Sequence, residues 1–485
     1  MLTDSLLLLA SLLVFAAVLI TKIGSRLGAP ALLLFLLMGM LVGEDVIGIP
    51  FNNYEAAESI GHFAMTVILF AGGLETSWKE TKPVLKQGLL LSTAGLLLTV
   101  IMTGLFTFYT VGNLVGGIAL SLTGCFLIAA IMSSTDSASV FYILREKKLL
   151  LRERLGPMLE FESGSNDPIA YVLTIILVDV LSSGMAQGPW YNIGHSALIL
   201  MIQMAVGFAI GVAVGQLGKI ILEKINLDNS SLTAILILST GFLANSLASF
   251  LHGNGLLALY VTSLIIGNRV KYQNKRDVLK FFDGMRWLMQ MVMFLMLGLL
   301  ARPSQMPQVA VPALLIGLFM LLVARPASTF ITLLPFKGMS FKAKLFTSLV
   351  GLKGAGPILF ALCPVVAGLD GSSEIFNIVF LITLLSLILQ GFSLPLIAHK
   401  LNLVYDADPE VESFGMVLPE EMGMLRDHLI SEDELSAGKT LRDLKLPHGI
   451  RVFMVKRDGS FLVPHGSMEL KAGDHLITII GDTDD

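Results

Sequence analysis

The sequence is poor in the residues that charge a surface or cross-link a chain. Only 14% of its 485 residues are Asp, Glu, Lys or Arg, and only two are cysteine. Basic residues nowhere form a block interleaved with aromatic residues, so nucleic acid is not an expected partner. Cys125 and Cys363 lie in different apolar segments, and two cysteines are too few for a disulfide framework or a metal site. We expect both to be packed thiols.

Apolar residues are abundant instead. They make up 54% of the chain, and the mean hydropathy is +0.78. A soluble protein of this size has too little interior to hide so much apolar surface, which predicts an all-α polytopic membrane protein. The first apolar run lacks a basic region before it and a small-residue cleavage site after it. We therefore expect a retained first span and not a signal peptide.

The apolar runs predict about thirteen transmembrane helices. They lie near 4–24, 29–44, 58–75, 83–109, 113–144, 155–181, 194–224, 231–250, 254–268, 280–301, 309–335, 341–368 and 374–398. Basic residues gather in alternate loops, near 22–26, 79–86, 145–154, 219–224, 269–280, 337–344 and 400, whereas Arg302 is the sole basic residue of the other set. The positive-inside rule then predicts that the N-terminus lies outside and the C-terminus in the cytoplasm. We expect the protein to lie in the inner (plasma) membrane of the cell.

The composition changes past His399. We predict a transmembrane domain over 1–400, a charged linker over 401–430 and a small cytoplasmic α/β domain over 431–485. The last segment alternates short β-type runs with Asp-Gly, His-Gly and Ala-Gly-Asp turns. A domain this small gains stability from pairing with a second copy, which is one reason to expect a homodimer.

Ionisable residues inside the predicted spans are costly to bury and are therefore functional candidates. The candidates are Asp136, Glu162, Asp167, Arg325 and Lys353. Asp283 and Arg286 stand one turn apart at a predicted helix start, where a local ion pair is the simpler interpretation.

The stretch "FESGSNDPIAY" carries two of these carboxylates in the sixth predicted span. From Leu155 to Asp167 a helix rises about 18 Å, which places Asp167 near the membrane midplane. Glu162 and Asn166, like Ser163 and Asp167, are four residues apart and project from one helical face. Pro168 lacks an N–H group, so it leaves a carbonyl one turn earlier without its helical donor. These oxygen ligands suit an alkali cation better than zinc or copper.

Two other predicted spans are interrupted. The sequence "MSSTDSAS" stands in the middle of the fifth span and "GLKGAGP" in the twelfth, and both disfavour a continuous helix. Broken helices at corresponding points of two halves indicate a transporter site. The span count is consistent with two six-helix repeats of inverted orientation.

Competition for one carboxylate is enough to make an antiporter if the site opens to each face in turn. We expect Asp167 to bind either a cation or a proton, with oxygen ligands from Asp136 and the Thr135 carbonyl. Because position 166 is Asn, the site carries one exchangeable charge, and exchange of one cation for one proton is electroneutral. Arg325 is the expected partner of Glu162. Lys353 neutralises either the carbonyl ends of half-helices or the charge of the site.

The motifs "SSTDSASVF", "FESGSNDPIA", "GNGLLALYVTSLIIGN" and "GLKGAGPI" resemble the NhaP-type branch of the monovalent cation/proton antiporters over residues 1–400. The resemblance implies a thirteen-helix homodimer with a core domain that moves against a dimerisation domain. It also implies that Thr135, Asp136, Ser163 and Asp167 bind the ion. Glu162 then approaches the ion through water, and Asn166 and the Arg325–Glu162 pair stabilise the site. "ESGSNDP" is more similar to the potassium/proton members than to the sodium/proton members.

Two positions depart from that family. Ser137 stands where many members have proline, which weakens the prediction of a break, and Lys353 stands where Arg is usual. The tail resembles TrkA-C regulatory lobes, which dimerise and bind small regulatory ligands such as nucleotides. No Gly-x-Gly-x-x-Gly sequence precedes it, so NAD is not expected and we predict no cofactor. Similar potassium members carry a further domain beyond this lobe.

Three alternatives remain. The tail is also consistent with a ligand-gated potassium channel, but no Thr-Val-Gly-Tyr-Gly filter is present. An intramembrane hydrolase would use Ser163 or Ser165, but His62 and His252 lie near loops and not at membrane depth. An electrogenic sodium/proton antiporter is disfavoured by Asn166. The preferred hypothesis is K⁺/H⁺ antiport, with Na⁺ as the second candidate cation.

Overall fold

The computed structural model describes residues 2–27, 30–49, 51–111, 120–147, 149–183, 189–225, 227, 229–270, 275–406, 425–430, 440–443, 450–457 and 460–480. The chain forms two compact units, Met1–Tyr405 and Asp406–Asp485. Much of the predicted linker, residues 407–424, lies outside the described residues, as do the first residues of the predicted fifth span.

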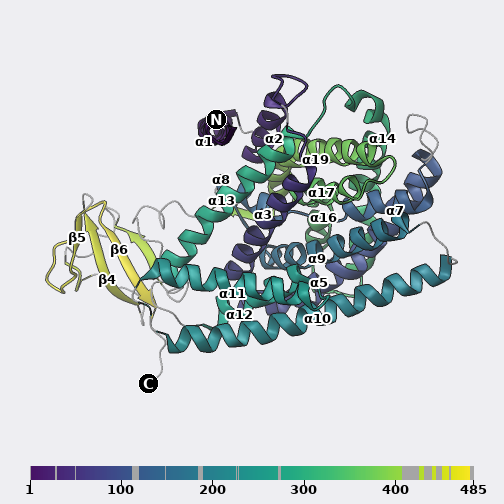
Figure 1. Ribbon diagram of the computed structural model, residues 1–485. Coiled ribbons are helices and arrows are strands. Elements are labelled where there is room, and N and C mark those ends of the chain that lie inside the picture. The colour runs from purple at the N-terminus through teal and green to yellow at the C-terminus, as the bar shows by residue number, and fades with distance from the viewer. Residues whose placement is uncertain are drawn as a thin grey trace. The chain divides into compact units, whose positions relative to one another are not determined.

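The first unit is helical (Figure 1). Its first half contains α1 (Leu2–Leu27), α2 (Ala31–Val42), α3 (Tyr54–Glu75), α4 (Trp78–Thr81), η1 (Lys82–Val84), α5 (Leu85–Leu90), η2 (Leu91–Gly95), α6 (Leu96–Phe106), η3 (Thr107–Val111), α7 (Leu122–Ile131), α8 (Ser137–Glu146) and α9 (Leu155–Ser182). Its second half contains α10 (Pro189–Lys224), α11 (Ser230–Phe250), α12 (Gly255–Arg269), α13 (Lys275–Leu299), α14 (Met306–Phe319), η4 (Met320–Ala324), α15 (Arg325–Leu333), α16 (Phe341–Leu349), α17 (Ala355–Phe360), α18 (Leu362–Val366) and α19 (Ser372–Lys400).

These helices confirm the predicted class of polytopic membrane protein. Each predicted span contains helix, and among the described residues seven helices are long and apolar enough to cross a membrane. Several others are apolar but shorter, because they are halves of interrupted spans or short inner helices. The number of membrane crossings and the inverted repeats stay predictions.

Side chains of Asn and Ser fix where several helices begin. Asn53, Ser121, Asn229, Asn254 and Ser340 each accept a hydrogen bond from a backbone N–H in the first turn. Such caps satisfy donors that the helix itself leaves unpaired. The sequence thus sets helix starts locally even where apolar residues continue.

Close helix packing in the first unit depends on glycine. Helices α2 and α13 meet at Gly39 and Gly298, where a Cβ atom would lie 2.2 Å from the Leu295 carbonyl oxygen and 2.4 Å from that of Leu36, respectively. Small residues allow this backbone approach in membrane proteins. At another edge of the unit, α10, α11 and α12 pack together (Figure 1).

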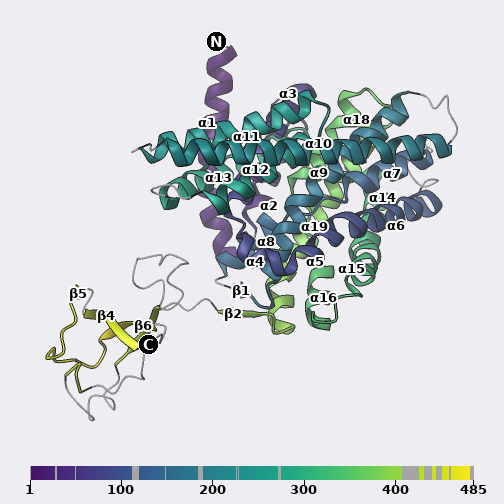
Figure 2. The same cartoon turned by 90° about the horizontal axis from the view of Figure 1, so that it is seen from below.

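Both predicted interruptions are present. Helices α7 and α8 are separated by Met132–Asp136, and α16 and α17 by Val350–Gly354. The helices that flank both breaks contact α9 and α19. Figure 2 shows α8, α9 and α19 near the middle of the first unit. The break before Ser137 forms without a proline there, because the polar groups of residues 133–136 find partners outside a helical ladder.

The second unit contains a four-stranded antiparallel sheet in the order β3-β6-β4-β5. The strands are β3 (Leu425–Leu429), β4 (Ile450–Arg457), β5 (Ser460–Leu462) and β6 (His475–Ile480). Its described core consists of Ile430, Val455, Leu470 and Leu476. The predicted β-type runs are therefore strands, whereas the described part of this unit contains no helix. A further strand pair, β1 (Leu149–Leu151) and β2 (Val404–Asp406), joins the loop before α9 to the chain after α19.

In the second unit, the buried carboxylate of Asp474 links the end of strand β4 to the turn that precedes strand β6. Asp474 accepts hydrogen bonds from Arg457 Nε at 2.8 Å and Nη2 at 2.6 Å, and from the Lys471 N–H at 2.8 Å. Burial by itself would raise the pKa of Asp474, but these hydrogen bonds more than offset it and hold the pKa below its usual value. The folded unit therefore binds this proton less tightly than the unfolded chain does. The stabilisation is complete above about pH 4 and is lost as the pH falls through the lower pKa of the folded state.

We expect Asp474→Asn to destabilise this unit by about 2 kcal/mol at pH 7, the usual worth of hydrogen bonds to a charged group. Amide hydrogen exchange of β6 in the full-length protein should then be about thirtyfold faster. The difference from wild type should shrink once the pH falls below about 4. Asp443→Asn is the control, because Asp443 accepts from Thr440 at an exposed position. Equal exchange in both variants at pH 7 would contradict the assignment.

Candidate ion-binding site

The site forms where the two broken spans meet. The Asp136 N–H donates to the Leu352 carbonyl oxygen at 2.8 Å, so one break supplies the donor and the other the acceptor. Asp136 also begins α8: its Oδ1 accepts from the Ser139 N–H at 3.0 Å, and its Oδ2 accepts from the Ser139 hydroxyl. A carboxylate at a helix start is favoured by the unpaired N–H groups there. This capping orients the carboxylate of Asp136, which is one of the predicted ion ligands.

Lys353 reaches across from the second break to the first. Its Nζ donates to the Ser134 carbonyl oxygen at 2.8 Å, and its N–H donates to Ser386 Oγ at 2.9 Å. Ser134 stands just beyond the C-terminal end of α7, where carbonyls lack helical partners. Of the two roles expected for Lys353, this geometry favours the neutralisation of a half-helix carbonyl end.

Helix α9 faces both breaks with four polar side chains. Ser163 Oγ donates to the Thr135 carbonyl oxygen at 2.8 Å and accepts from the Ser137 N–H at 3.2 Å. Asn166 Nδ2 donates to Thr135 Oγ1 at 2.5 Å. The Thr135 carbonyl, expected to bind the ion directly, is therefore already held by Ser163.

Asp167 is hydrogen-bonded to the first break through Ser134, which precedes the predicted ligands Thr135 and Asp136 in the sequence. The Ser134 hydroxyl donates to Asp167 Oδ1, and within the described residues this is the only hydrogen bond to that carboxylate. Sequence reasoning used Ser134 only as a helix breaker and missed this contact. Its signal was its position beside Thr135 and Asp136 in "SSTD".

A cavity of about 300 Å³ reaches the site. Asp136, Ser163 and Asp167, the three residues predicted to hold a monovalent cation, all line it. Glu162 and Asn166 do not line it, and they are only 1% and 2% exposed. The structure thus divides the polar face of α9 into two residues on the cavity and two that are packed away from it.

Glu162 forms a buried ion pair with Arg325, which lies at the start of α15. Arg325 is 7% exposed, so neither charge is solvated by bulk water. Removing one partner of such a pair leaves the other charge buried and uncompensated. The predicted pairing is therefore present, and each charge of the pair compensates the other.

Pro168 does not break its helix. Helix α9 runs without interruption from Leu155 to Ser182. The carbonyl of Pro168 itself accepts from Asn254 Nδ2 at 2.8 Å, while Asn254 Oδ1 caps α12 by accepting from the Leu257 N–H at 2.8 Å. The carbonyl that Pro168 leaves without a helical donor stays a prediction, whereas the link from the Pro168 carbonyl to α12 is an additional contact. Asn254 belongs to the motif "GNG", but its target could not be read from the sequence.

Three further acidic residues line the cavity: Glu75, Glu160 and Asp283. Arg286 pairs with Asp283 at 3.7 Å, as predicted, but it also forms a closer ion pair with Glu75 of α3 that the sequence did not reveal. A cavity wall with an excess of carboxylates raises the local concentration of cations. The arrangement is therefore suited to guide a cation to Asp167.

Gly354 allows the second break to pack on Asp136. A Cβ atom at this position would lie 2.1 Å from Asp136 Oδ2. We expect Gly354→Ala to displace the carboxylate and raise the cation concentration for half-maximal exchange roughly tenfold, since overpacking costs about 1–3 kcal/mol. Gly72→Ala is the control, because Gly72 lines the same cavity and a Cβ there meets nothing within 4 Å. An unchanged concentration dependence in Gly354→Ala would contradict this role.

Comparison with known proteins agrees with this arrangement. Residues 12–400 match the family of sodium/hydrogen exchanger transmembrane domains, and residues 425–485 match the TrkA-C domain. The protein named K⁺/H⁺ antiporter NhaP2 from Shewanella sp. (strain MR-4) is 36% identical, over 98% of this chain and 81% of that protein. The K⁺/H⁺ antiporter NhaP of Alkalimonas amylolytica is 34% identical, over 97% of this chain and 80% of that protein.

The fold is also that of a solved structure. The sodium proton antiporter MjNhaP1 from Methanocaldococcus jannaschii has a TM-score of 0.67, with 81% of this chain and 97% of that chain covered at 23% identity. The predicted class of transporter, as opposed to enzyme, is confirmed. The chain belongs to the sodium/hydrogen exchanger family and is a membrane cation/proton antiporter with a C-terminal TrkA-C domain.

Proposed function

We propose that this protein exchanges K⁺ for H⁺, one for one and without net charge movement, by alternating access. Cation and proton compete for Asp167. Asp136, Ser163 and Thr135 supply further oxygen ligands, while Asn166, Lys353 and the Arg325–Glu162 pair stabilise the site. The observation that carries the proposal is that Asp136, Ser163 and Asp167 line one cavity, together with further carboxylates.

Competition follows from the small number of partners that Asp167 has. A carboxylate held by one serine hydroxyl needs either a cation or a proton to offset its burial. A proton on the carboxylate removes the negative charge that would hold a cation, so the two compete for the same oxygens. Each cycle then carries a cation in one direction and a proton in the other.

Electroneutral exchange is supported by the role of Asn166. It is neutral and donates to Thr135, so it helps to hold the break without placing a second carboxylate next to Asp167. An electrogenic Na⁺/H⁺ antiporter would need a second exchangeable charge. Two relatives named K⁺/H⁺ antiporters support K⁺, whereas the protein named probable Na⁺/H⁺ antiporter 2 of Methanocaldococcus jannaschii, 28% identical over 72% of this chain, keeps Na⁺ as an alternative.

Alternating access is supported by the position of the cavity along α3. The cavity is lined by α3 residues from Met65 to Thr76. We infer that it faces the cytoplasm, since the loop charges put the C-terminal end of α3 inside. We also propose that the chain lies in the inner (plasma) membrane, with its N-terminus outside and its TrkA-C domain in the cytoplasm; the loop charges support this orientation. We further propose a homodimer and a small regulatory ligand, such as a nucleotide, on that domain.

Everted membrane vesicles with a fluorescent pH reporter test the proposal. K⁺, Na⁺ and Li⁺ are added in turn, with and without valinomycin to clamp the membrane potential. We expect K⁺ to give the largest proton movement, at a rate that the clamp does not change. No cation-driven proton movement would refute antiport, a rate that follows the potential would refute electroneutrality, and a larger response to Na⁺ would refute the K⁺ assignment.

A further inference from the structure

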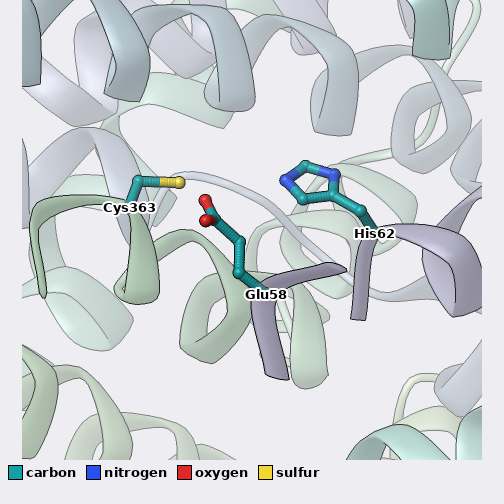
Figure 3. Close-up of side chains that lie close together, drawn as sticks. All are labelled: Glu58, His62 and Cys363. Carbon is teal, nitrogen blue, oxygen red and sulfur yellow. The ribbon is translucent and has the colours of Figure 1, made fainter. Parts of the chain in front are cut away.

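A second group of polar side chains lies in the first unit apart from the ion site. Glu58 and His62 stand one turn apart on α3, and Cys363 projects from α18 toward them. Figure 3 shows the carboxylate of Glu58 between the sulfur of Cys363 and the imidazole of His62. One oxygen, one nitrogen and the sulfur of these residues all lie within 4.8 Å of one another. None of the three residues lines the cavity that holds Asp167.

The ligand chemistry of this group differs from that of the ion site. One thiol, one imidazole and one carboxylate form a set that binds zinc and similar transition metals, and not an alkali cation. Tetrahedral zinc with bonds of about 2.0–2.3 Å holds its ligand atoms about 3.3–3.8 Å apart, which small side-chain rotations would reach here. Counting cysteines alone excluded a metal site, but one cysteine suffices when two other ligand types converge on it.

A second observation supports a ligand at this position. His62 Nε2 is buried and has no hydrogen-bond partner among the described residues. A buried polar nitrogen without a partner is costly, and a bound cation would satisfy it. The His62 ring is held by an edge contact with Tyr171, with ring centroids 4.8 Å apart at an interplanar angle of 72°. The imidazole is therefore already oriented.

Residues near the cluster on α3 and α18 line a second cavity. A separate cavity of about 330 Å³ is lined by Tyr54, one turn before Glu58, and by Val365, two residues after Cys363. It lies toward the N-terminal end of α3, whereas the ion-site cavity lies along its C-terminal part. Along α3 and α18, the cluster is thus adjacent to residues of this second cavity.

The cluster joins two parts of the transport machinery. Helix α3 forms one wall of the ion-site cavity, and α18 continues the broken span that carries Lys353. We propose that Glu58, His62 and Cys363 bind a transition-metal cation of the zinc class, which fixes α3 to α18 and slows exchange. The effect on exchange rests on the proposed alternating access; the binding of the metal does not.

Cobalt binding to the full-length protein in detergent tests the site directly. Co²⁺ bound to a thiolate gives a charge-transfer absorption in the near ultraviolet, and tetrahedral Co²⁺ gives strong visible bands. We expect one Co²⁺ per chain, displaced by Zn²⁺, and no thiolate band in Cys363→Ser. Cys125→Ser is the matched control and should keep the band, since Cys125 is the only other thiol. No thiolate band in wild type, or the same band in Cys363→Ser, would overturn the site.

His62→Gln is the second variant, because it tests the site while it leaves the thiol in place. We expect its dissociation constant for Co²⁺ to rise roughly tenfold or more, the range seen when a metal site loses a supporting group. Size-exclusion profiles and thermal unfolding show whether each variant is folded. A folded His62→Gln protein that binds Co²⁺ as wild type does would remove His62 from the site.

Transport in vesicles tests the consequence. We expect Zn²⁺ at its wild-type dissociation constant to slow exchange about twofold in wild type and Cys125→Ser, because half of the sites are then occupied. Exchange by Cys363→Ser and His62→Gln should hardly change at this concentration, since losing a ligand weakens metal binding about tenfold or more. Equal inhibition of all four proteins would place the inhibitory metal elsewhere. Binding without inhibition would refute the clamp between α3 and α18. If wild type shows no exchange at all, the proposed function fails, while the cobalt spectra still decide the site.

Discussion

Replacing Asp167 with Asn is expected to reduce K⁺-driven proton movement to the background of vesicles without the protein. The amide cannot take up a proton at physiological pH, nor can it neutralise a bound cation. The Ser134 hydroxyl can still donate to the amide oxygen, so the local packing should survive. The loss would therefore come from chemistry and not from misfolding.

The matched control for this variant is Asp179→Asn. Asp179 lies on the same helix but is exposed near its end, so its replacement should leave exchange unchanged. A direct binding readout separates the cation from the proton. K⁺ at about one hundred times its dissociation constant should stabilise wild type against unfolding by about 2.7 kcal/mol. Asp167→Asn should show no such stabilisation, and exchange by this variant at the wild-type rate would refute the central role of Asp167.

Replacing Glu162 with Gln is expected to cost about 3–5 kcal/mol of stability, because Arg325 is left as an unpaired buried charge. Glu162 and Arg325 are both almost fully buried, and they connect α9 to α15. Thermal unfolding in detergent measures the loss. The double variant Glu162→Gln/Arg325→Met should recover much of it, since no uncompensated charge remains.

An exposed ion pair provides the comparison. Arg302 and Glu44 lie 3.4 Å apart, with side chains 35% and 42% exposed. Such a pair contributes about 0–1 kcal/mol, so Arg302→Gln should hardly change unfolding. If Glu162→Gln unfolds no earlier than Arg302→Gln, the buried pair is not what stabilises the site.

Much of the site could be predicted because its residues break local rules. Asp136, Glu162 and Asp167 are carboxylates in apolar segments, and "GLKGAGP" cannot form a regular helix. Each is a conflict between a residue and its immediate surroundings, which a sequence shows directly. The resemblance of these motifs to the antiporter family then assigned roles in ion binding to the residues within them.

The partners of these residues could not be predicted in the same way. Ser134, Asn254 and Glu75 are ordinary polar residues in sequence, and their roles depend on helices that meet only after folding. Cys363 likewise comes to lie beside Glu58 and His62 across some three hundred residues of chain. Pro168 lies inside the continuous helix α9, and the contact of its carbonyl with Asn254 of a distant segment could not be read from the sequence either.

The strand pair β1–β2 has a mechanical meaning. The Arg152 N–H donates to the Leu403 carbonyl at 2.8 Å, so the chain that leaves α19 is fastened to the short loop between α8 and α9. Helix α8 begins directly after Asp136, and helix α9 contains Asp167. A displacement of the backbone at β2 is therefore transmitted to the loop that joins α8 to α9, the two helices next to the proposed ion-binding carboxylates.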